Sequence, residues 1–497
     1  MSTQIYVISL ISAAVIAAVS VVMCYLRGEP GQKAFWRNLA FIFLSAFLIP
    51  GLIFYFKRDA SPWWLLLAVV ALVVAFQRPL SALSWKSVPL TLVGPALQGK
   101  GPAKGLKVVH LSDLHLCSPS AVTMEGKLSM DRVLEANKRA FAWACEQQPD
   151  LIAVTGDVTD SGDSAEWDVL KSILEQLPPA CRANVVVVPG NHDLTITLGD
   201  FIGTRDGRAL LEYEKRCALF VRHGLSTMPP NAKLWFGDRE VPLTELFDSI
   251  GQYLTLHEKF PARVRTTSEA PRSVASFFNV FRRRRGWQQI HEWRGRLDYY
   301  VPGIVLAPEL VAAIEQKQGS SWPTSQTPLV QDLLQELYPL IVFENEKFVV
   351  VALNSNTGPA GWIADGALGS LGTRQLGRLE LILNQRERDK CVIVLLHHHV
   401  GCPDEVRPLV AKPDAALRML QLQDGTQLLS LLQRHGGNFI VLHGHKHVGY
   451  WAKAGTTTVI SGASVSYGDK RGAHNCAAYF INEKGEVYLH SHTRISV

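Results

Sequence analysis

Five short segments of the sequence carry residue types that bind divalent metal ions. Each contains aspartate, asparagine or histidine, and each follows a short apolar run. Carboxylate, carboxamide and imidazole ligands, with no thiolate among them, suit Mn, Fe, Co, Ni or Zn. The segments therefore predict a metal site, and their ligand types leave the metal's identity open. They are Asp113-x-His115, Gly156-Asp157-x-x-Asp160, Gly190-Asn191-His192-Asp193, His397-His398-His399 and Gly444-His445-x-His447.

The spacing within these segments also fits metal binding. Residues two apart on an extended loop, such as Asp113 and His115, present their side chains on one face. Three segments contain a glycine, which allows the sharp backbone turns that such loops need. Any one segment alone could be a helix cap, a turn or a structural histidine. Their occurrence together favours a metal centre.

Alternating strands and helices are predicted to position the first three segments. Buried-strand runs at Leu106–Ser112, Asp150–Thr155 and Asn184–Val188 each end at one of them. Helical spacing at Asp131–Gln147 and Ala165–Leu177 lies between the strands, with Asp163 or Ser164 as the expected cap of the second helix. This alternation predicts an α/β sheet, and ligands of such sheets bind beyond the carboxyl ends of the strands.

The pattern stops over Leu194–Asn345, where little periodicity is visible, and resumes at Lys347–Leu353. A helix is expected over Thr373–Gln385. Strands that end at the two histidine-rich segments are expected over Lys390–Leu396 and Asn438–Leu442. Two further strand-like runs, Thr457–Ser461 and Cys476–Tyr488, follow.

The order of the five segments resembles the signature of the calcineurin-like metallophosphoesterase family: D-x-H, G-D-x-x-D, G-N-H-[DE], a histidine-rich strand end and G-H-x-H. The resemblance covers roughly residues 106–195 and 347–495. It implies a layered α/β sandwich of two central sheets flanked by helices. It also implies a metal-dependent phosphoric ester hydrolase that binds two divalent ions. In such enzymes a hydroxide that bridges the metals attacks phosphorus, so no serine or cysteine nucleophile is required.

The resemblance assigns each residue a role. Asp157 would bridge the two metals, and one histidine of 397–399 would bind the second. The family usually has His-x-Pro at that place, and alignment on the Pro position favours His398. This chain lacks the proline, so His397 remains an alternative. The metal ligands that the resemblance implies are Asp113, His115, Asp157, Asn191, His398, His445 and His447.

The remaining polar residues of the segments have other expected roles. His192 would face the substrate, stabilising the transition state or protonating the leaving group. Asp193 would orient His192. His399 and His443 are expected to be structural or to support the ligands from behind.

The sequence gives weaker information on the substrate. The segment after Gly156 lacks the arginine of protein Ser/Thr phosphatases and departs from the G-D-L-F-E of UDP-diacylglucosamine hydrolases. Leu353-Asn354-Ser355 and the following helix look most like bacterial cyclic-nucleotide phosphodiesterases. The predicted function is hydrolysis of phosphodiester or phosphomonoester bonds. The alternatives are a UDP-diacylglucosamine-type pyrophosphate or phospholipid hydrolase, and a catalytically inactive binding module.

The first part of the chain has a different composition from the rest. Overall, 47% of the residues are hydrophobic and 19% are charged, which excludes a disordered chain. Stretches without charge at Ile5–Leu26, Leu39–Phe56 and Pro62–Phe76 predict two or three transmembrane helices. The expected organisation is a membrane anchor at 1–92, a linker at 93–105 and a metallophosphoesterase domain at 106–497 with a long insert at about 195–345.

Charges near these stretches predict the orientation. Lys and Arg follow the first and third stretches, so three spans would place the large remainder on the cytoplasmic side of an inner or plasma membrane; only Lys57–Arg58 opposes this orientation. The net charge of +6 comes from this front part, so nucleic-acid binding is not expected. The eight cysteines form no C-x-x-C pair, and several are expected to be ordinary buried thiols.

One part of the insert is strongly basic. Arg282–Arg285 lie among Phe277, Phe278, Phe281 and Trp287. This stretch is either a solvated loop or a flap that contacts acidic lipid or an anionic substrate. The expected partners are a phosphate-ester substrate and membrane lipid, while the sequence indicates nothing about the oligomeric state.

Overall fold

A computed structural model describes most of the chain from residue 89 onward. The predicted transmembrane stretches and the basic segment around Arg282–Arg285 lie outside the described residues. Within the described part, no helix has the length and apolar character needed to cross a membrane. The described residues are 89–94, 105–118, 128–194, 208–236, 239–259, 263–264, 304–305, 330–356, 369–386, 389–406, 422–469 and 474–495.

Five strands form the first sheet, in the order β16-β15-β2-β3-β4. Three neighbouring strands, β2, β3 and the edge strand β4, run parallel, as expected from the alternation of strands and helices. The last expected strand run is instead a hairpin of β15 and β16. The bounds are β2 Leu106–Leu111, β3 Leu151–Val154, β4 Val185–Val187, β15 Cys476–Ile481 and β16 Val487–Thr493.

Nine strands form the second sheet, in the order β1-β13-β14-β12-β11-β10-β9-β5-β6. Its centre, β10, β11, β12 and β14, is parallel. The bounds are β1 Thr91–Val93, β5 Lys233–Phe236, β6 Arg239–Pro242, β9 Leu340–Glu344, β10 Phe348–Ala352, β11 Cys391–Leu395, β12 Phe439–His443, β13 Tyr450–Ala454 and β14 Thr457–Ser461.

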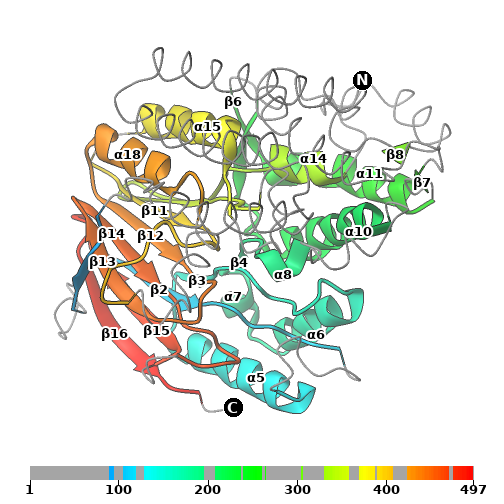
Figure 1. The fold of residues 1–497 in the computed structure, drawn as a ribbon, viewed down its shortest axis with the longest axis horizontal. Coiled ribbons are helices and arrows are strands. Elements are labelled where there is room, and N and C mark those ends of the chain that lie inside the picture. Colours follow the sequence, from blue (N-terminus) through cyan, green and yellow to red (C-terminus); the bar gives the residue numbers. More distant parts are fainter. Residues whose placement is uncertain are drawn as a thin grey trace, which may run out of the picture. The chain divides into compact units, whose positions relative to one another are not determined.

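The apolar core shows how the two sheets are layered. On β11, Ile393 and Leu395 pack with residues of the five-stranded sheet, whereas Val392 and Val394 pack toward α15 (Gly372–Gln385) and α18 (Gly425–His435). Side chains alternate between the two faces of a strand, so one strand serves both cores. Figure 1 shows α15 and α18 on one side and α5 (Met130–Glu146) and α6 (Ser164–Glu175) on the other. The expected two-sheet α/β sandwich is confirmed.

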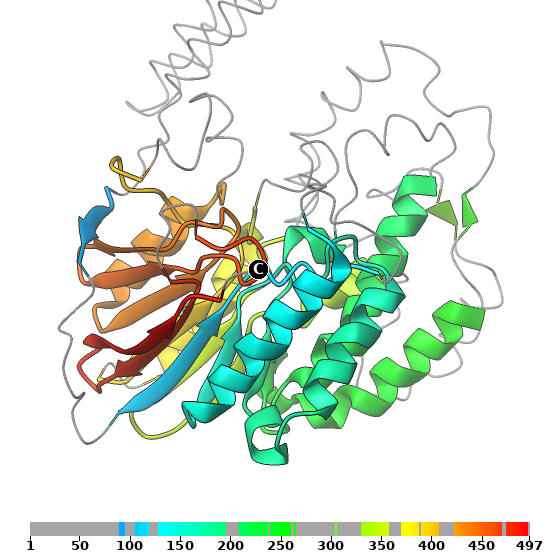
Figure 2. The same cartoon turned by 90° about the horizontal axis from the view of Figure 1, so that it is seen from below.

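Parts of the expected insert are built into the sandwich. β5, β6 and β9 extend the nine-stranded sheet. α10 packs beside α6, and Figure 2 shows α5, α6 and α10 next to one another. The bounds of the remaining elements are α7 Pro179–Arg182, α8 Asn191–Leu194, α10 Arg208–His223, η2 Leu225–Thr227, η3 Leu243–Leu246, α11 Phe247–Lys259, β7 Arg263–Val264, β8 Ile304–Val305 and α14 Val330–Glu336.

Two local features stabilise the first α/β half. Asp163 caps α6 in a capping box with Glu166, which satisfies backbone N–H groups that would otherwise lack partners. Cys145 at the end of α5 forms a disulfide with Cys181 in α7, with Cα atoms 5.6 Å apart. Nothing in the sequence indicated this pairing, because α5 and α7 bring residues distant in sequence together; five other described cysteines are free and buried, as expected for several of the eight.

Candidate metal centre

Two groups of buried side chains collect at the carboxyl ends of the parallel strands. The first group is Asp113, His115 and His447, and the second is Asp157, His397 and His445. In each group, one potential ligand atom per residue lies within 4.8 Å of the others. All six residues had been singled out from the sequence, His397 as the alternative to His398. The sheets therefore bring loops separated by more than 300 residues into one site.

Asp157 joins the two groups through a single carboxylate oxygen. Its Oδ2 lies 3.2 Å from Nε2 of His397 in its own group. The same Oδ2 lies 3.9 Å from Nε2 of His115 in the other group. One oxygen that faces both groups is the arrangement that a bridging ligand requires.

Within each group the donor atoms converge. Nε2 of His447 lies 3.2 Å from Nε2 of His115 and 3.4 Å from Oδ1 of Asp113. In the second group, Nε2 of His397 lies 3.0 Å from Oδ1 of Asn191 and 3.1 Å from Nδ1 of His445. Nitrogen lone pairs that face oxygens and each other at such distances need a proton or a cation between them.

The backbone of the site is strained. Six described non-glycine residues have positive φ, and five of them are Asp113, His115, Asp157, His445 and His447. Each such conformation costs on the order of 1 kcal/mol and is typical of functional loops. Gly190 has another reason to be glycine, because a Cβ there would lie 2.0 Å from the Asp157 amide nitrogen.

The electrostatics of the site favour bound positive charge. Burial alone would raise the pKa of Asp113, but His447 and His397 hold it at about 2. Burial alone would lower the pKa of His397, but the neighbouring Asp157 and Asp113 raise it to about 9. Carboxylates that stay ionised in a buried site, and that attract protons to the imidazoles, also attract divalent cations. The donor set therefore fits two metal ions.

Of the two candidate histidines that follow β11, the structure brings His397 into the second ligand group. His397 faces Asp157, whereas Nδ1 of His398 lies 2.8 Å from Oγ of Ser355. The two residues lie in a bend after β11, where strand alternation no longer applies, and their rings lie 4.9 Å and 4.5 Å from that of His445. The contact that separates them is the one to Asp157, and the hydropathy of β11, which is buried on both faces, does not indicate which histidine makes it.

The position of His397 beside Asp157 predicts that two matched variants bind different numbers of metal ions. His397→Gln should retain about one metal ion per chain, because it removes the imidazole that faces Asp157 and Asn191. His398→Gln should retain two, since glutamine can still hydrogen-bond with Ser355. Inductively coupled plasma mass spectrometry of desalted protein measures the content. Loss of one ion from His398→Gln with full retention by His397→Gln would reverse the assignment.

The contacts of His192 and Asp193 also differ from expectation. Nδ1 of His192 lies 2.7 Å from the Asp160 carbonyl oxygen, so Asp160 orients the ring. Asp193 instead accepts hydrogen bonds from Thr159 and from the Gly190 amide. The three residues Asn191, His192 and Asp193 form a helical turn, in which successive side chains point about 100° apart. Asp193 therefore holds the loop, and not the imidazole.

Sequence reasoning missed a supporting loop at Gly462–Gly468. Ser464 donates a hydrogen bond to the Asp113 carbonyl oxygen, and the Val465 amide donates to that of Ser112. Tyr467 stacks on His447 with ring centroids 5.2 Å apart and meets His115 edge-on at 5.1 Å. The loop fixes two imidazoles of the first group. No local pattern in its sequence indicates this contact.

Asp160 belongs to the segment that begins at Gly156, but the sequence assigns it no role. The structure shows one. Its Oδ1 lies 3.1 Å from Nδ1 of His115, leaving Nε2 of that ring to face the first group. A carboxylate behind a histidine ligand fixes the ring's orientation and increases its basicity. His399 and His443 are fully buried behind the site, and neither belongs to a ligand group of the described residues, which agrees with a structural role.

Comparison with known proteins agrees with this geometry. Residues 106–303 match the family model described as calcineurin-like phosphoesterase. Over these residues the chain is similar to calcineurin-like phosphoesterases. Members of this family use two divalent metals, the number that the two joined groups can accommodate.

Three similar proteins show how much of the chain is matched and at what sequence identity. A probable cyclic nucleotide phosphodiesterase of Coxiella burnetii is 35% identical over 88 residues, which is 18% of this chain and 32% of the relative. A probable glycerophosphodiester phosphodiesterase of Arcobacter nitrofigilis is 32% identical over 91 residues, 17% of this chain and 29% of the relative. The match thus spans about a third of these relatives' length. A dimetal phosphatase structure from Danio rerio aligns with TM-score 0.34 and 12% identity, covering 76% of this chain and 92% of that one.

Proposed function

We propose that this protein is a dinuclear-metal phosphoesterase that hydrolyses phosphodiester bonds. The observation that carries the proposal is Asp157 Oδ2, which faces both ligand groups from one buried position. Two bound divalent ions would supply an activated water near neutral pH and would neutralise charge that develops on phosphorus oxygens. The names of the relatives, two of which are phosphodiesterases, support a diester substrate.

Some residues of the site would bind the ions, and another would contact the substrate. Asp113, His115 and His447 would hold one ion, and Asn191, His397 and His445 the other, with Asp157 between them. His192 is the open residue: its side chain is 26% exposed, whereas those of His115 and Asp157 are 3% and 2% exposed. A substrate that approaches the centre therefore meets His192, which is placed to donate a proton to the leaving group.

The test is hydrolysis by the full chain reconstituted in lipid nanodiscs. Bis-p-nitrophenyl phosphate, p-nitrophenyl phosphate, a 3′,5′-cyclic nucleotide and a glycerophosphodiester are compared with added Mn²⁺ and after chelation. We expect turnover of the diesters to exceed that of the monoester and to disappear with chelator. Chelator-resistant turnover would contradict the metal mechanism, and a preference for the monoester would contradict the substrate class.

We also propose that residues 1–92 hold the domain at a membrane. The support is the hydropathy of the three charge-free stretches, and the flanking Lys and Arg favour a cytoplasmic domain. The disulfide between Cys145 and Cys181 argues against a cytoplasmic domain, because disulfides persist mainly in oxidising compartments. Anchoring stands on the hydropathy alone and does not depend on which side the domain occupies.

A further inference from the structure

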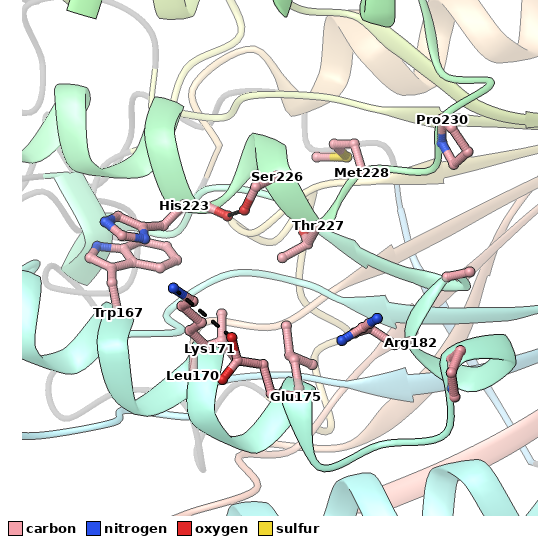
Figure 3. Close-up of a pocket in the computed structure, with 13 residues that line it drawn as sticks. Trp167, Leu170, Lys171, Glu175, Arg182, His223, Ser226, Thr227, Met228 and Pro230 are labelled. Carbon is pink, nitrogen blue, oxygen red and sulfur yellow. Dashed lines mark hydrogen bonds and ion pairs between the residues drawn. The ribbon is translucent and has the colours of Figure 1, made fainter. Parts of the chain in front are cut away.

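A cavity of about 370 Å³ shares no lining residue with the metal centre. Figure 3 shows it between α6 and α7 on one side and η2 with the end of α10 on the other. Its size lies within the range of small-molecule sites in proteins. Neither the expected residues of the metal centre nor the proposed hydrolysis gives this cavity a role.

The floor of the cavity is apolar and comes largely from one face of α6. Trp167, Leu170 and Leu174 occupy positions i, i+3 and i+7, which lie on one side of a helix. All three are buried, as is Met228 after η2. His223 lines the cavity at the tryptophan end, its ring stacked near the indole at a centroid distance of 6.1 Å. Trp167 and Leu170 are covered by the protein itself, so the apolar surface that a ligand can reach comes from Leu174 and Met228, which are 7% and 5% exposed.

The edge of the cavity carries positive charge. Lys171 lies 3.9 Å from Glu175, an exposed pair of the kind that contributes little energy. Arg182 has no ion pair within the described part of the chain, and Figure 3 shows it at the far end from Trp167 and His223. A guanidinium without a carboxylate partner, at the edge of an apolar cavity, is suited to bind the anionic end of a ligand.

We propose that this cavity binds a small organic acid, with its apolar body beside Leu174 and Met228 and its anionic group at Arg182. The site is separate from hydrolysis and does not rest on the proposed function. The anionic group is the shared feature of carboxylates, sulfonates and phosphates. A carboxylate is the suitable probe, because a phosphate ester would also be a substrate of the metal centre.

The probe is 4-fluorophenylacetate, titrated onto the full chain in nanodiscs and followed by the ¹⁹F line width. Its matched neutral analogue is 4-fluorophenylacetamide, and empty nanodiscs give the partition into lipid. The titration is repeated with chelator, since a carboxylate could also bind metal ions. We expect saturable binding of the acid that is unchanged by chelator and at least about tenfold tighter than binding of the amide.

Three variants locate the site. Arg182→Glu and Ser226→Trp, the second of which fills the cavity from its exposed edge, should each weaken acid binding at least about tenfold. Arg132→Glu, the same charge change at an exposed position on α5, should leave the affinity within about twofold. The proposal is overturned if chelator abolishes binding, if the amide binds as tightly as the acid, if Arg182→Glu and Arg132→Glu behave alike, or if nothing saturates.

Discussion

Asp157→Asn is expected to reduce turnover of bis-p-nitrophenyl phosphate by at least about three decades. The change replaces the carboxylate whose Oδ2 faces both His115 and His397 with a neutral, weaker ligand. The same side chain accepts a hydrogen bond from the His192 amide through Oδ1 at 2.8 Å. Asparagine keeps one oxygen that can accept this bond, so the loop that carries His192 should hold its place.

The matched control is Asp150→Asn. This carboxylate accepts a hydrogen bond from the Lys107 amide and is remote from both ligand groups. Its turnover should stay within about twofold of wild type, as for most surface substitutions. Metal content by mass spectrometry should fall for Asp157→Asn only. An Asp157→Asn protein with near-normal turnover would remove the basis for the proposed dinuclear function.

The candidate ligands that come together in the site were largely predictable because the signal is local. Asp113 and His115 lie two residues apart, as do His445 and His447, and each pair follows a run of apolar residues that forms a strand. The strand before Asp113 belongs to the five-stranded sheet and the strand before His445 to the nine-stranded sheet, and ligands bind beyond the carboxyl ends of such strands. Motif and fold therefore agree about where these residues lie, and the structure brings them together.

The side-chain directions beyond these motifs were not predictable in the same way. The choice between His397 and His398 depends on the bend after β11, and the apolar strand before it carries no signal for that bend. The role of Asp193 depends on the turn of α8, which redirects it to Thr159 and Gly190. In both cases the sequence predicts the correct segment, but the local backbone conformation determines which side chain faces the site.

Long-range pairing was the other limit. β5, β6 and β9 join the nine-stranded sheet from a stretch without clear periodicity, at an edge that other strands must first create. Tyr467 reaches His447 and His115 through a loop whose hydrogen bonds go to residues some 350 positions earlier. Such contacts depend on the assembled fold, and a single sequence carries no pattern that specifies them.

His192→Ala is expected to lower kcat by about 10²–10⁴ while leaving the metal content unchanged. The imidazole is held at Nδ1 by the Asp160 carbonyl oxygen, and it is the most open polar side chain beside Asp157. The backbone amide that binds Asp157 remains in the alanine variant, so the second ligand group should persist. His490→Ala, an exposed histidine on β16, is the matched control and should keep full turnover.

The dependence of kcat on the leaving group distinguishes proton donation by His192 from a role in supporting the loop. If His192 protonates the departing oxygen, kcat of His192→Ala should fall much further with an alkyl diester than with bis-p-nitrophenyl phosphate, because p-nitrophenolate departs without protonation. A purely structural role would lower both rates equally and would reduce the metal content. An equal loss with both diesters at full metal content would assign His192 to stabilising charge on the phosphorus oxygens, and would contradict its role as the acid.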